Sequence, residues 1–159
     1  GGFGTSLRFY GVDFSIGFTY QLGGQVLDQG YMFYMNSPAG TSTGNNYHHD
    51  LLNSWTPENS GSNIPRFAYN DSNQAAVSDR FLTSASYLNI QNITLGYTLP
   101  KRITRKFLVE NLRIYLACDN VWYWSKRQGL DPRQAINGIT NPYYYAPIRT
   151  FSGGVTVTF

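Results

Sequence analysis

The sequence is short of charged residues, of cysteine and of long apolar runs. Only 13% of its 159 residues are Asp, Glu, Lys or Arg, whereas about 25% is usual for a soluble domain. The single cysteine, Cys118, excludes an intrachain disulfide. No stretch approaches the roughly 20 apolar residues of a membrane-spanning helix. The net charge of +3 is modest, and it gives nucleic-acid binding little support.

Motifs for catalysis are also missing. The sequence contains no GxSxG elbow, no phosphate-binding loop and no Cys–His pair with an orienting partner. We therefore predict a protein that is not an enzyme and that has no cofactor. The chain starts with Gly-Gly-Phe, without Met or a signal-peptide pattern, so we expect a mature piece or a fragment of a longer protein.

The chain is rich in aromatic residues and glycine, and it contains stretches in which apolar and polar residues alternate. Aromatic residues make up 16%, with 13 Tyr, and the mean hydropathy is -0.33. Five stretches alternate apolar with polar residues at the period of two that is typical of a strand. They cover residues 3–10, 12–22, 86–99, 111–122 and 150–159. A slip in the alternation near Gln91–Asn92 predicts a β-bulge.

The connections between these stretches differ in length. Tyr10-Gly11 predicts a tight hairpin turn, and residues 100–110 form a short basic connector. Residues 25–84 and 123–147 are long, irregular loops, with short helices expected within 26–35 and 51–55. Short turns at one end and long loops at the other are typical of outer-membrane barrels. Five strands cannot close a barrel. Either other strands complete it, or the apolar face packs in a soluble core.

Eight segments carry a family likeness, in a consistent order. They are GGFGTSL (1–7), FSIGFTYQLGG (14–24), WTPEN (55–59), SDRFL (78–82), SYLNIQNITLGYTLP (86–100), NLRIYLACDNV (111–121), GLDP (129–132) and RTFSGGVTVTF (149–159). Together they resemble the C-terminal region of SusC-like TonB-dependent outer-membrane transporters of the Bacteroidetes type. Cys118 departs from the pattern, because a small residue is expected there.

The resemblance implies an all-β fold, namely the last five strands of an antiparallel transmembrane β-barrel of about 22 strands with long extracellular loops. The plug domain would be absent from this chain. The implied location is the cell outer membrane, and the implied function is import of glycans or other large nutrients. The implied partners are the remainder of the barrel and plug, a SusD-like surface lipoprotein, the TonB complex acting through the absent plug region, outer-membrane lipid, and the insertion machinery during assembly.

Three groups of residues are candidates for function. The external loops carry aromatic residues that suit stacking on sugars, packing on a lid protein, or packing of the loops on each other: Trp55, Tyr69, Tyr143, Tyr144 and Tyr145. Arg113 and Asp119 lie on the polar face and are expected to line the lumen. By resemblance, the final strand carries an assembly signal, formed by Phe151, Val155, Val157 and Phe159.

Two loop motifs hint at metal binding, but we predict no metal site at either. His48 and His49 are adjacent, and adjacent side chains of an extended chain point in opposite directions. Residues 70–73 (Asn-Asp-Ser-Asn) lack the Gly and the distal Glu of a calcium loop. The basic residues Lys101, Arg102, Arg105 and Lys106 suit either a solvated turn or contact with lipid phosphates.

Two alternatives to the transporter interpretation stay open at this point. One is a soluble all-β carbohydrate-binding or adhesin domain. The other is a barrel fragment held as a client of the outer-membrane insertion machinery.

Overall fold

The computed structural model describes residues 1–36, 46–71, 73–74, 76–127, 129–135, 137–141 and 143–159. The chain divides into two units. The first consists of Gly1–Gly24, Ala85–Gly129 and Tyr145–Phe159, and the second of Gln25–Ser84 and Leu130–Tyr144. Among the described residues, no helix combines the length and the apolar character needed to span a membrane.

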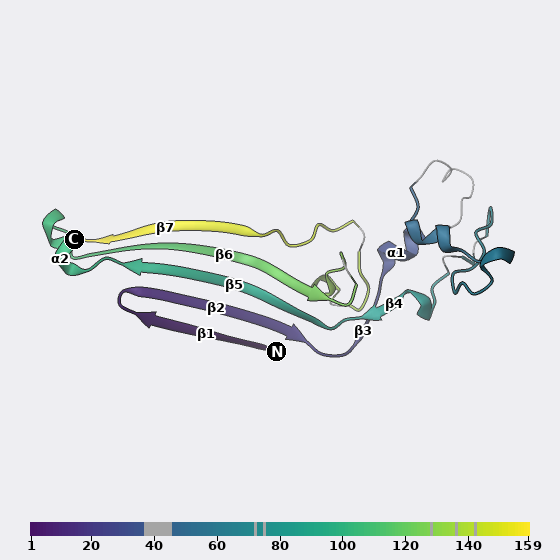
Figure 1. Cartoon of the computed structure of the whole chain (residues 1–159), viewed down its shortest axis with the longest axis horizontal. Coiled ribbons are helices and arrows are strands. Elements are labelled where there is room, and N and C mark those ends of the chain that lie inside the picture. Colours follow the sequence, from purple (N-terminus) through teal and green to yellow (C-terminus); the bar gives the residue numbers. More distant parts are fainter. Residues whose placement is uncertain (37–45, 72, 75, 128, 136, 142) are drawn as a thin grey trace. The chain divides into compact units, whose positions relative to one another are not determined.

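The first unit is a five-stranded antiparallel sheet in the order β1-β2-β5-β6-β7 (Figure 1). Its strands are β1 (Gly2–Phe9), β2 (Val12–Gln21), β5 (Tyr87–Thr98), β6 (Asn111–Ser125) and β7 (Thr150–Thr158). The expected antiparallel β architecture is confirmed. Within the described residues β1 and β7 each pair with one neighbour, so closure into a barrel would need further strands.

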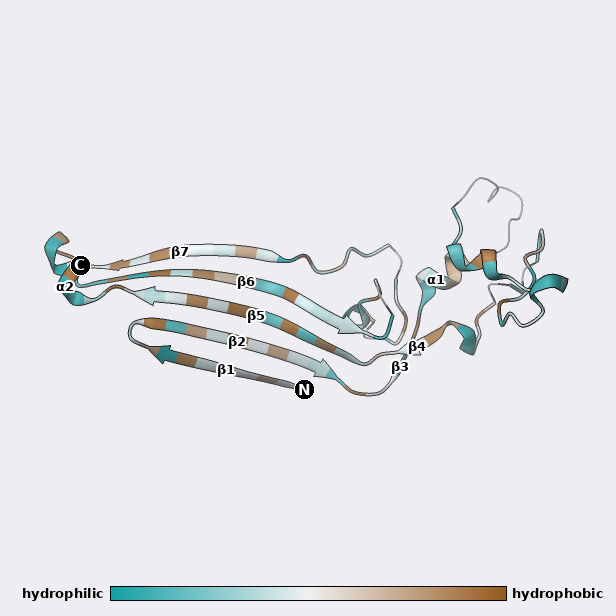
Figure 2. Ribbon diagram, viewed as in Figure 1, coloured by the Kyte–Doolittle hydropathy of each residue, from teal (hydrophilic) through white to brown (hydrophobic). Residues whose placement is uncertain are grey.

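The register places apolar residues of neighbouring strands opposite one another. Phe14 of β2 pairs with Leu7 of β1 and with Leu95 of β5, and Leu95 pairs in turn with Leu116 of β6. Side chains alternate between the two faces of a strand, so one face of the sheet is apolar from β1 to β7 and the other is polar. The brown and pale bands along each strand in Figure 2 show this alternation.

The apolar face lacks a cover in the described part of the chain. Leu7 is 62% exposed, Leu116 65% and Phe151 76%. A sheet in a soluble domain buries its apolar face against a second layer. An exposed apolar surface of this extent is unfavourable in water and is typical of a surface that contacts lipid or another protein.

The predicted bulge is confirmed. Gly17 of β2 pairs with Asn92, but the next residue, Phe18, pairs with Ile90, so Gln91 is an extra residue on β5. The β5–β6 register shifts at the same place. The extra residue keeps Ile90 on the apolar face, although the alternation of β5 changes phase there.

The β1–β2 connection is the predicted two-residue turn. Tyr10 has a φ of 46° and Gly11 a φ of 85°, and positive φ at both positions gives the twist that suits a two-residue hairpin. A Cβ atom on Gly11 would lie 2.6 Å from the carbonyl oxygen of Thr98. The turn therefore requires glycine for both its backbone conformation and the available space.

The β5–β6 connector is a folded turn. It contains α2 (Lys101–Thr104) and η5 (Arg105–Phe107), and it ends at Leu108 with a φ of 59°. Thr104 and Val109 are its buried residues. The short basic connector is thus helical over most of its length.

The second unit is built around a short ladder. Strand β3 (Gln25–Leu27) pairs with β4 (Leu82–Ser84), and Leu27 also forms a parallel bridge with Ile139. Helix α1 (Gln29–Tyr34) follows β3 and is capped by the Asp28 side chain. The short helix expected within residues 26–35 is therefore confirmed, and it begins after residues 26–27, which belong to the ladder.

The small core of the second unit consists of Val26, Met35 and Phe81, each no more than 1% exposed. The remaining helical turns are η2 (His49–Asn53), η3 (Pro57–Asn59), η4 (Asp79–Phe81) and η6 (Pro132–Gln134).

Candidate functional site

An ion pair crosses the polar face of the sheet between two strands that are not neighbours. Arg113 of β6 donates from Nε to Oδ1 of Asp13 on β2 at 3.0 Å, and from Nη2 to Oδ2 at 2.5 Å. Strand β5 lies between them, and its Gly96 pairs with Asp13. A Cβ atom on Gly96 would lie 2.5 Å from both Arg113 Nη2 and Asp13 Oδ2. Only glycine leaves room for this bidentate pair.

The aromatic ring of Tyr115 extends this polar cluster to the last strand. Arg113 Cζ lies 5.3 Å from the centre of the ring, within the range of a cation–π contact. Tyr115 pairs with Gly154 of β7, and a Cβ on Gly154 would lie 2.6 Å from Cε1 of the ring. The ring thus covers the glycine, as in aromatic rescue of a strand glycine. The cluster connects β2, β5, β6 and β7.

The register places the two predicted lumen residues on this polar face. Arg113 pairs with Thr98, and Asp119 pairs with Asn92. That this face lines a lumen stays a prediction. The ion-pair partner of Arg113 is Asp13, and no local pattern indicates that ion pair, because 100 residues separate the two. The only available signal is that Asp13 is a carboxylate on the polar side of the cleanest alternating stretch.

The candidate loop aromatics are exposed but belong to both units. Trp55, Tyr69, Tyr143 and Tyr144 lie in the second unit, and Tyr145 lies in the first. Their exposed fractions range from 38% for Trp55 to 97% for Tyr145. Exposed rings of this kind can stack on a sugar or pack against a protein. Binding by these five residues stays a prediction.

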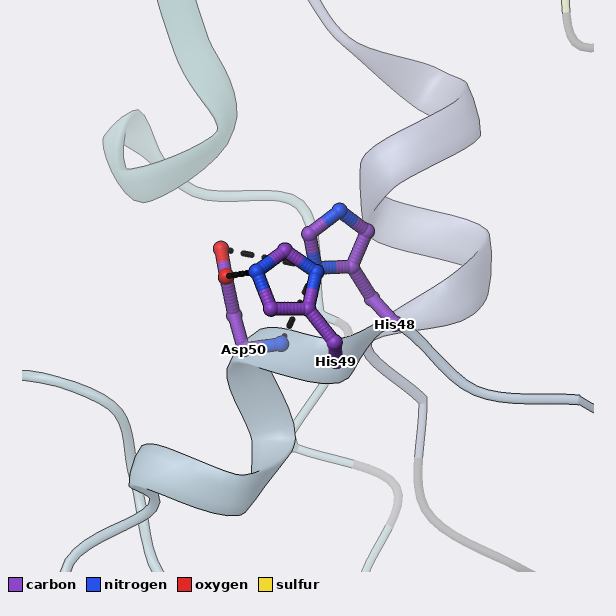
Figure 3. A group of neighbouring side chains, drawn as sticks. All are labelled: His48, His49 and Asp50. Atoms are coloured by element: carbon purple, nitrogen blue, oxygen red, sulfur yellow. Dashed lines mark hydrogen bonds and ion pairs between the residues drawn. The ribbon is translucent and has the colours of Figure 1, made fainter.

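The geometry of His48 and His49 corrects one expectation. Their side chains do not point in opposite directions, because the extended backbone ends at His48 and a helical turn follows. His48 caps η2 and His49 is the first residue of that turn, which brings the ring centres to 4.6 Å. Figure 3 shows both rings beside the Asp50 carboxylate. His49 Nε2 lies 3.0 Å from Asp50 Oδ1.

Hydrogen bonds within this cluster account for its arrangement. His48 Nδ1 accepts the backbone N–H of Asp50 at 3.2 Å, and the hydroxyl of Tyr31 donates to Asp50 Oδ2 at 2.9 Å. The ligand atoms of His48, His49 and Asp50 lie within 4.8 Å of one another, a spacing that could hold a metal ion. However, the Nδ1 lone pair of His48 is directed at the Asp50 N–H. We therefore still predict no metal site here, because His48 Nδ1 is used to cap η2.

Two further loop motifs have local structural roles. Asp131, in the GLDP segment, is 6% exposed and caps η6 by accepting the backbone N–H of Arg133 at 3.1 Å. Its carboxylate also accepts hydrogen bonds from the Arg133 guanidinium at 2.8 and 2.6 Å. In the Asn-Asp-Ser-Asn segment, Asp71 accepts the N–H of Asn73 at 2.9 Å, as in an Asx turn. Ser72 lies outside the described residues.

The residues of the expected assembly signal lie at the sheet edge. Phe151, Val155 and Val157 of β7 pair with Cys118, Ile114 and Leu112 of β6. They therefore share the apolar face, and Phe159, 87% exposed, follows them. Their role in assembly stays a prediction.

Comparison with known proteins supports the transporter resemblance, although no family model matches the chain. TonB-dependent receptor P3 of Formosa agariphila is 26% identical over 168 residues, covering 99% of this chain and 16% of the receptor. TonB-dependent receptor SusC of Bacteroides thetaiotaomicron is 36% identical over 84 residues, covering 52% of this chain and 8% of SusC. The structure of the RagAB peptide importer in its closed-closed state superposes with a TM-score of 0.83 and 24% identity. The match covers 100% of this chain and 17% of the importer chain. At that identity the structural likeness shows the fold.

The antiparallel sheet, with one apolar face and one polar face, thus has the fold of part of that importer. The chain is homologous to TonB-dependent receptors, SusC among them. It spans about one sixth of their length, since it covers 16% of P3 and 17% of the RagAB chain. These receptors are transporters, not enzymes, and they reside in the outer membrane.

Proposed function

We propose that the chain forms the last five strands of a barrel of about 22 strands that imports large nutrients across the outer membrane. The observation that carries the proposal is the apolar face that extends over all five strands and has no covering layer among the described residues. Facing lipid, this surface has a favourable environment, while the opposite polar face suits a wet lumen.

Strand length supports a membrane-spanning role. Strands β1, β2, β5, β6 and β7 contain 8, 10, 12, 15 and 9 residues. A tilted transmembrane strand needs about 9–11 residues. The sheet as a whole is therefore long enough to cross the hydrocarbon layer.

The connections give the orientation that we propose. The β1–β2 turn and the β5–β6 connector are short, whereas residues 22–86 and 126–149 join the other strand ends by long segments. Outer-membrane barrels have short periplasmic turns and longer extracellular loops. The exposed loop aromatics would then face the cell exterior, where cargo and a SusD-like lipoprotein would meet them. Energy would come from TonB through a plug outside this chain.

The cargo class is a glycan or a peptide. RagAB is a peptide importer by its name, and aromatic faces in polar loops serve either cargo. Uptake of fluorescent oligosaccharides and oligopeptides by cells that carry the full-length receptor separates the two. Deletion of the receptor gene should abolish uptake of one class. Unchanged uptake of both classes in the deletion strain would contradict a role as their importer.

Alternating spin labels test the barrel itself. In the full-length receptor in membranes, labels at Leu116 and Val155 should be accessible to oxygen, which concentrates in lipid. Labels at Ala117 and Thr156, one residue along each strand, should be accessible to a water-soluble nickel chelate. Labels at Leu116 and Val155 that neither oxygen nor the nickel chelate reaches, in a protein soluble without detergent, would support the soluble-domain alternative instead.

The position of the strands and the insertion-client alternative need a different measurement. Mass spectrometry of the receptor extracted from outer membranes should find one polypeptide that contains a plug and the upstream strands, with β7 as its last strand. A short polypeptide found only with the insertion machinery would contradict the proposal.

A further inference from the structure

The β5–β6 connector carries an unusual combination of charge and exposed apolar surface. We name residues 101–108 the basic wedge. Backbone hydrogen bonds hold it against the sheet on both sides: the N–H of Leu99 donates to the Leu112 carbonyl at 2.9 Å, and the N–H of Glu110 donates to the Thr158 carbonyl at 2.8 Å. The wedge is therefore a folded projection with a fixed position at the end of the sheet.

The exposure pattern of the wedge is opposite to that of a helix in a soluble domain. Ile103, Phe107 and Leu108 are 45%, 73% and 89% exposed, while the polar residue Thr104 is 2% exposed. An amphipathic helix in water turns its apolar residues toward the core. The wedge turns them outward, so it presents three apolar side chains without a partner in the described part of the chain.

All four cations of the wedge are exposed, and the wedge contains no acidic residue. They are Lys101, Arg102, Arg105 and Lys106. Among the described residues none of them takes part in an ion pair. The surface therefore combines unpaired positive charge with exposed apolar side chains within eight residues.

Aromatic residues lie at the same end of the sheet. Phe9 and Tyr10, at the β1–β2 turn, are 72% and 86% exposed, and Phe159, just after β7, is 87% exposed. The register places these residues level with the wedge, since Val12 pairs with Tyr97 and Asn111 pairs with Thr158. Aromatic residues at strand ends mark the membrane–water interface.

We propose that the basic wedge inserts into the inner leaflet of the outer membrane and binds anionic phospholipids. Ile103, Phe107 and Leu108 would lie at the boundary between headgroups and acyl chains. The four cations would lie against lipid phosphates. Charge complementarity favours this occupant, because shallow apolar insertion beside clustered cations is how interfacial segments bind anionic membranes. The inference rests on the proposed function for its orientation.

Depth-dependent quenching in nanodiscs tests the location. The full-length receptor is labelled with a fluorophore at Leu108→Cys, with Leu116→Cys as the reference on the apolar face, both in a Cys118→Ser background. Lipids that carry a nitroxide near the headgroup should quench the Leu108 label more than lipids that carry it deep in the chain. The Leu116 label should show the opposite preference.

The charges are tested separately with lipid selectivity. Spin-labelled phosphatidylglycerol should associate with the receptor more strongly than spin-labelled phosphatidylcholine. Replacing all four wedge cations by Gln should reduce this preference to about one. Replacing Lys126 and Arg149 by Gln, two cations outside the wedge, serves as the matched control and should leave most of the preference in place.

The outcomes separate this inference from the proposed function. If lipid quenches the Leu116 label but not the Leu108 label, the wedge faces water or another protein and the inference is wrong, while the barrel stands. If lipid quenches neither label, the proposed function fails. A phosphatidylglycerol preference unchanged by the four Gln substitutions, in a receptor that still migrates as a folded barrel, also overturns the inference.

Discussion

Arg113 and Asp13 meet over Gly96, and the two charged side chains join strands that do not share a backbone hydrogen bond. Two guanidinium–carboxylate hydrogen bonds connect β6 to β2 above the intervening β5. Backbone pairing holds only neighbouring strands together. This side-chain bridge therefore adds a tie across three strands, and it depends on the missing side chain at position 96.

The first prediction concerns Gly96→Ala. The new Cβ would occupy the space of the charged atoms, so the Arg113 fork should leave the Asp13 carboxylate. We expect the full-length receptor in detergent to unfold at a lower temperature, measured as the loss of the folded band in a gel-shift melting experiment. Combining Gly96→Ala with Arg113→Gln should lower the melting temperature by less than the sum of the two single changes, because both remove the same interaction.

The control for this experiment is Gly153→Ala on the opposite face. Its Cβ would lie 3.0 Å from Leu116 Cδ2, the end of a flexible side chain that can move aside. We expect little change in melting temperature. Equal losses for Gly96→Ala and Gly153→Ala would contradict a specific role of the ion pair.

The second prediction concerns the β1–β2 turn. Gly11→Ala puts a side chain at a φ of 85°, which costs about 1–2 kcal/mol in the left-handed region, and it adds a collision with the Thr98 carbonyl oxygen. The matched change is Gly23→Ala, which has a φ of 79° but no described atom within 4 Å of the new Cβ. Urea unfolding of the full-length receptor should show a larger loss of stability for Gly11→Ala. Equal losses would mean that the Thr98 collision adds nothing.

The sheet is predictable because each signal is local. The alternation in residues 12–22 fixes the two faces of β2, and the phase slip at Gln91 marks the bulge within one strand. Tyr10-Gly11 marks the tight turn within two residues. None of these signals needs information about a partner strand.

The features that escape prediction depend on contacts between distant residues. The pairing of Asp13 with Arg113 follows from the register of three strands. Strand β3 has only three residues and is defined by its partners β4 and Ile139. The rings of His48 and His49 come together because η2 begins there, and a short turn with few periodic residues leaves no pattern in the sequence.

The third prediction tests the role of His48. As an acceptor for the Asp50 N–H, it should be replaceable by Asn, whose side-chain oxygen is a good cap, but not by Ala, at a local cost of about 1 kcal/mol. Hydrogen exchange of the Asp50 amide in the full-length receptor should be faster in His48→Ala and close to wild type in His48→Asn. Zinc or a chelator should change neither rate. Zinc-dependent protection that disappears in His49→Ala would show that the cluster binds metal.

The fourth prediction concerns the loop aromatics and separates binding from packing. Replacing Tyr143, Tyr144 and Tyr145 together by Ala should weaken binding of cargo or of the lipoprotein partner to the full-length receptor by about ten-fold or more, because each aromatic interaction that the variant removes contributes about 0.5–1.5 kcal/mol. Isothermal titration and the melting temperature would be measured on the same samples. We expect the melting temperature to change little, because these rings are 77%, 68% and 97% exposed.

Phe67 provides the control for that triple variant, because its ring packs edge-on against Tyr47 at 5.7 Å within the other long loop, residues 25–84. Phe67→Ala should lower local stability, measured as faster hydrogen exchange in residues 46–71, while affinity stays near wild type. If the Tyr143–Tyr145 variant instead behaves like Phe67→Ala, with faster exchange and unchanged affinity, these tyrosines pack the loops on one another. The aromatic contribution to binding would then have to come from Trp55 and Tyr69, whose own Ala variants would be measured by the same titration.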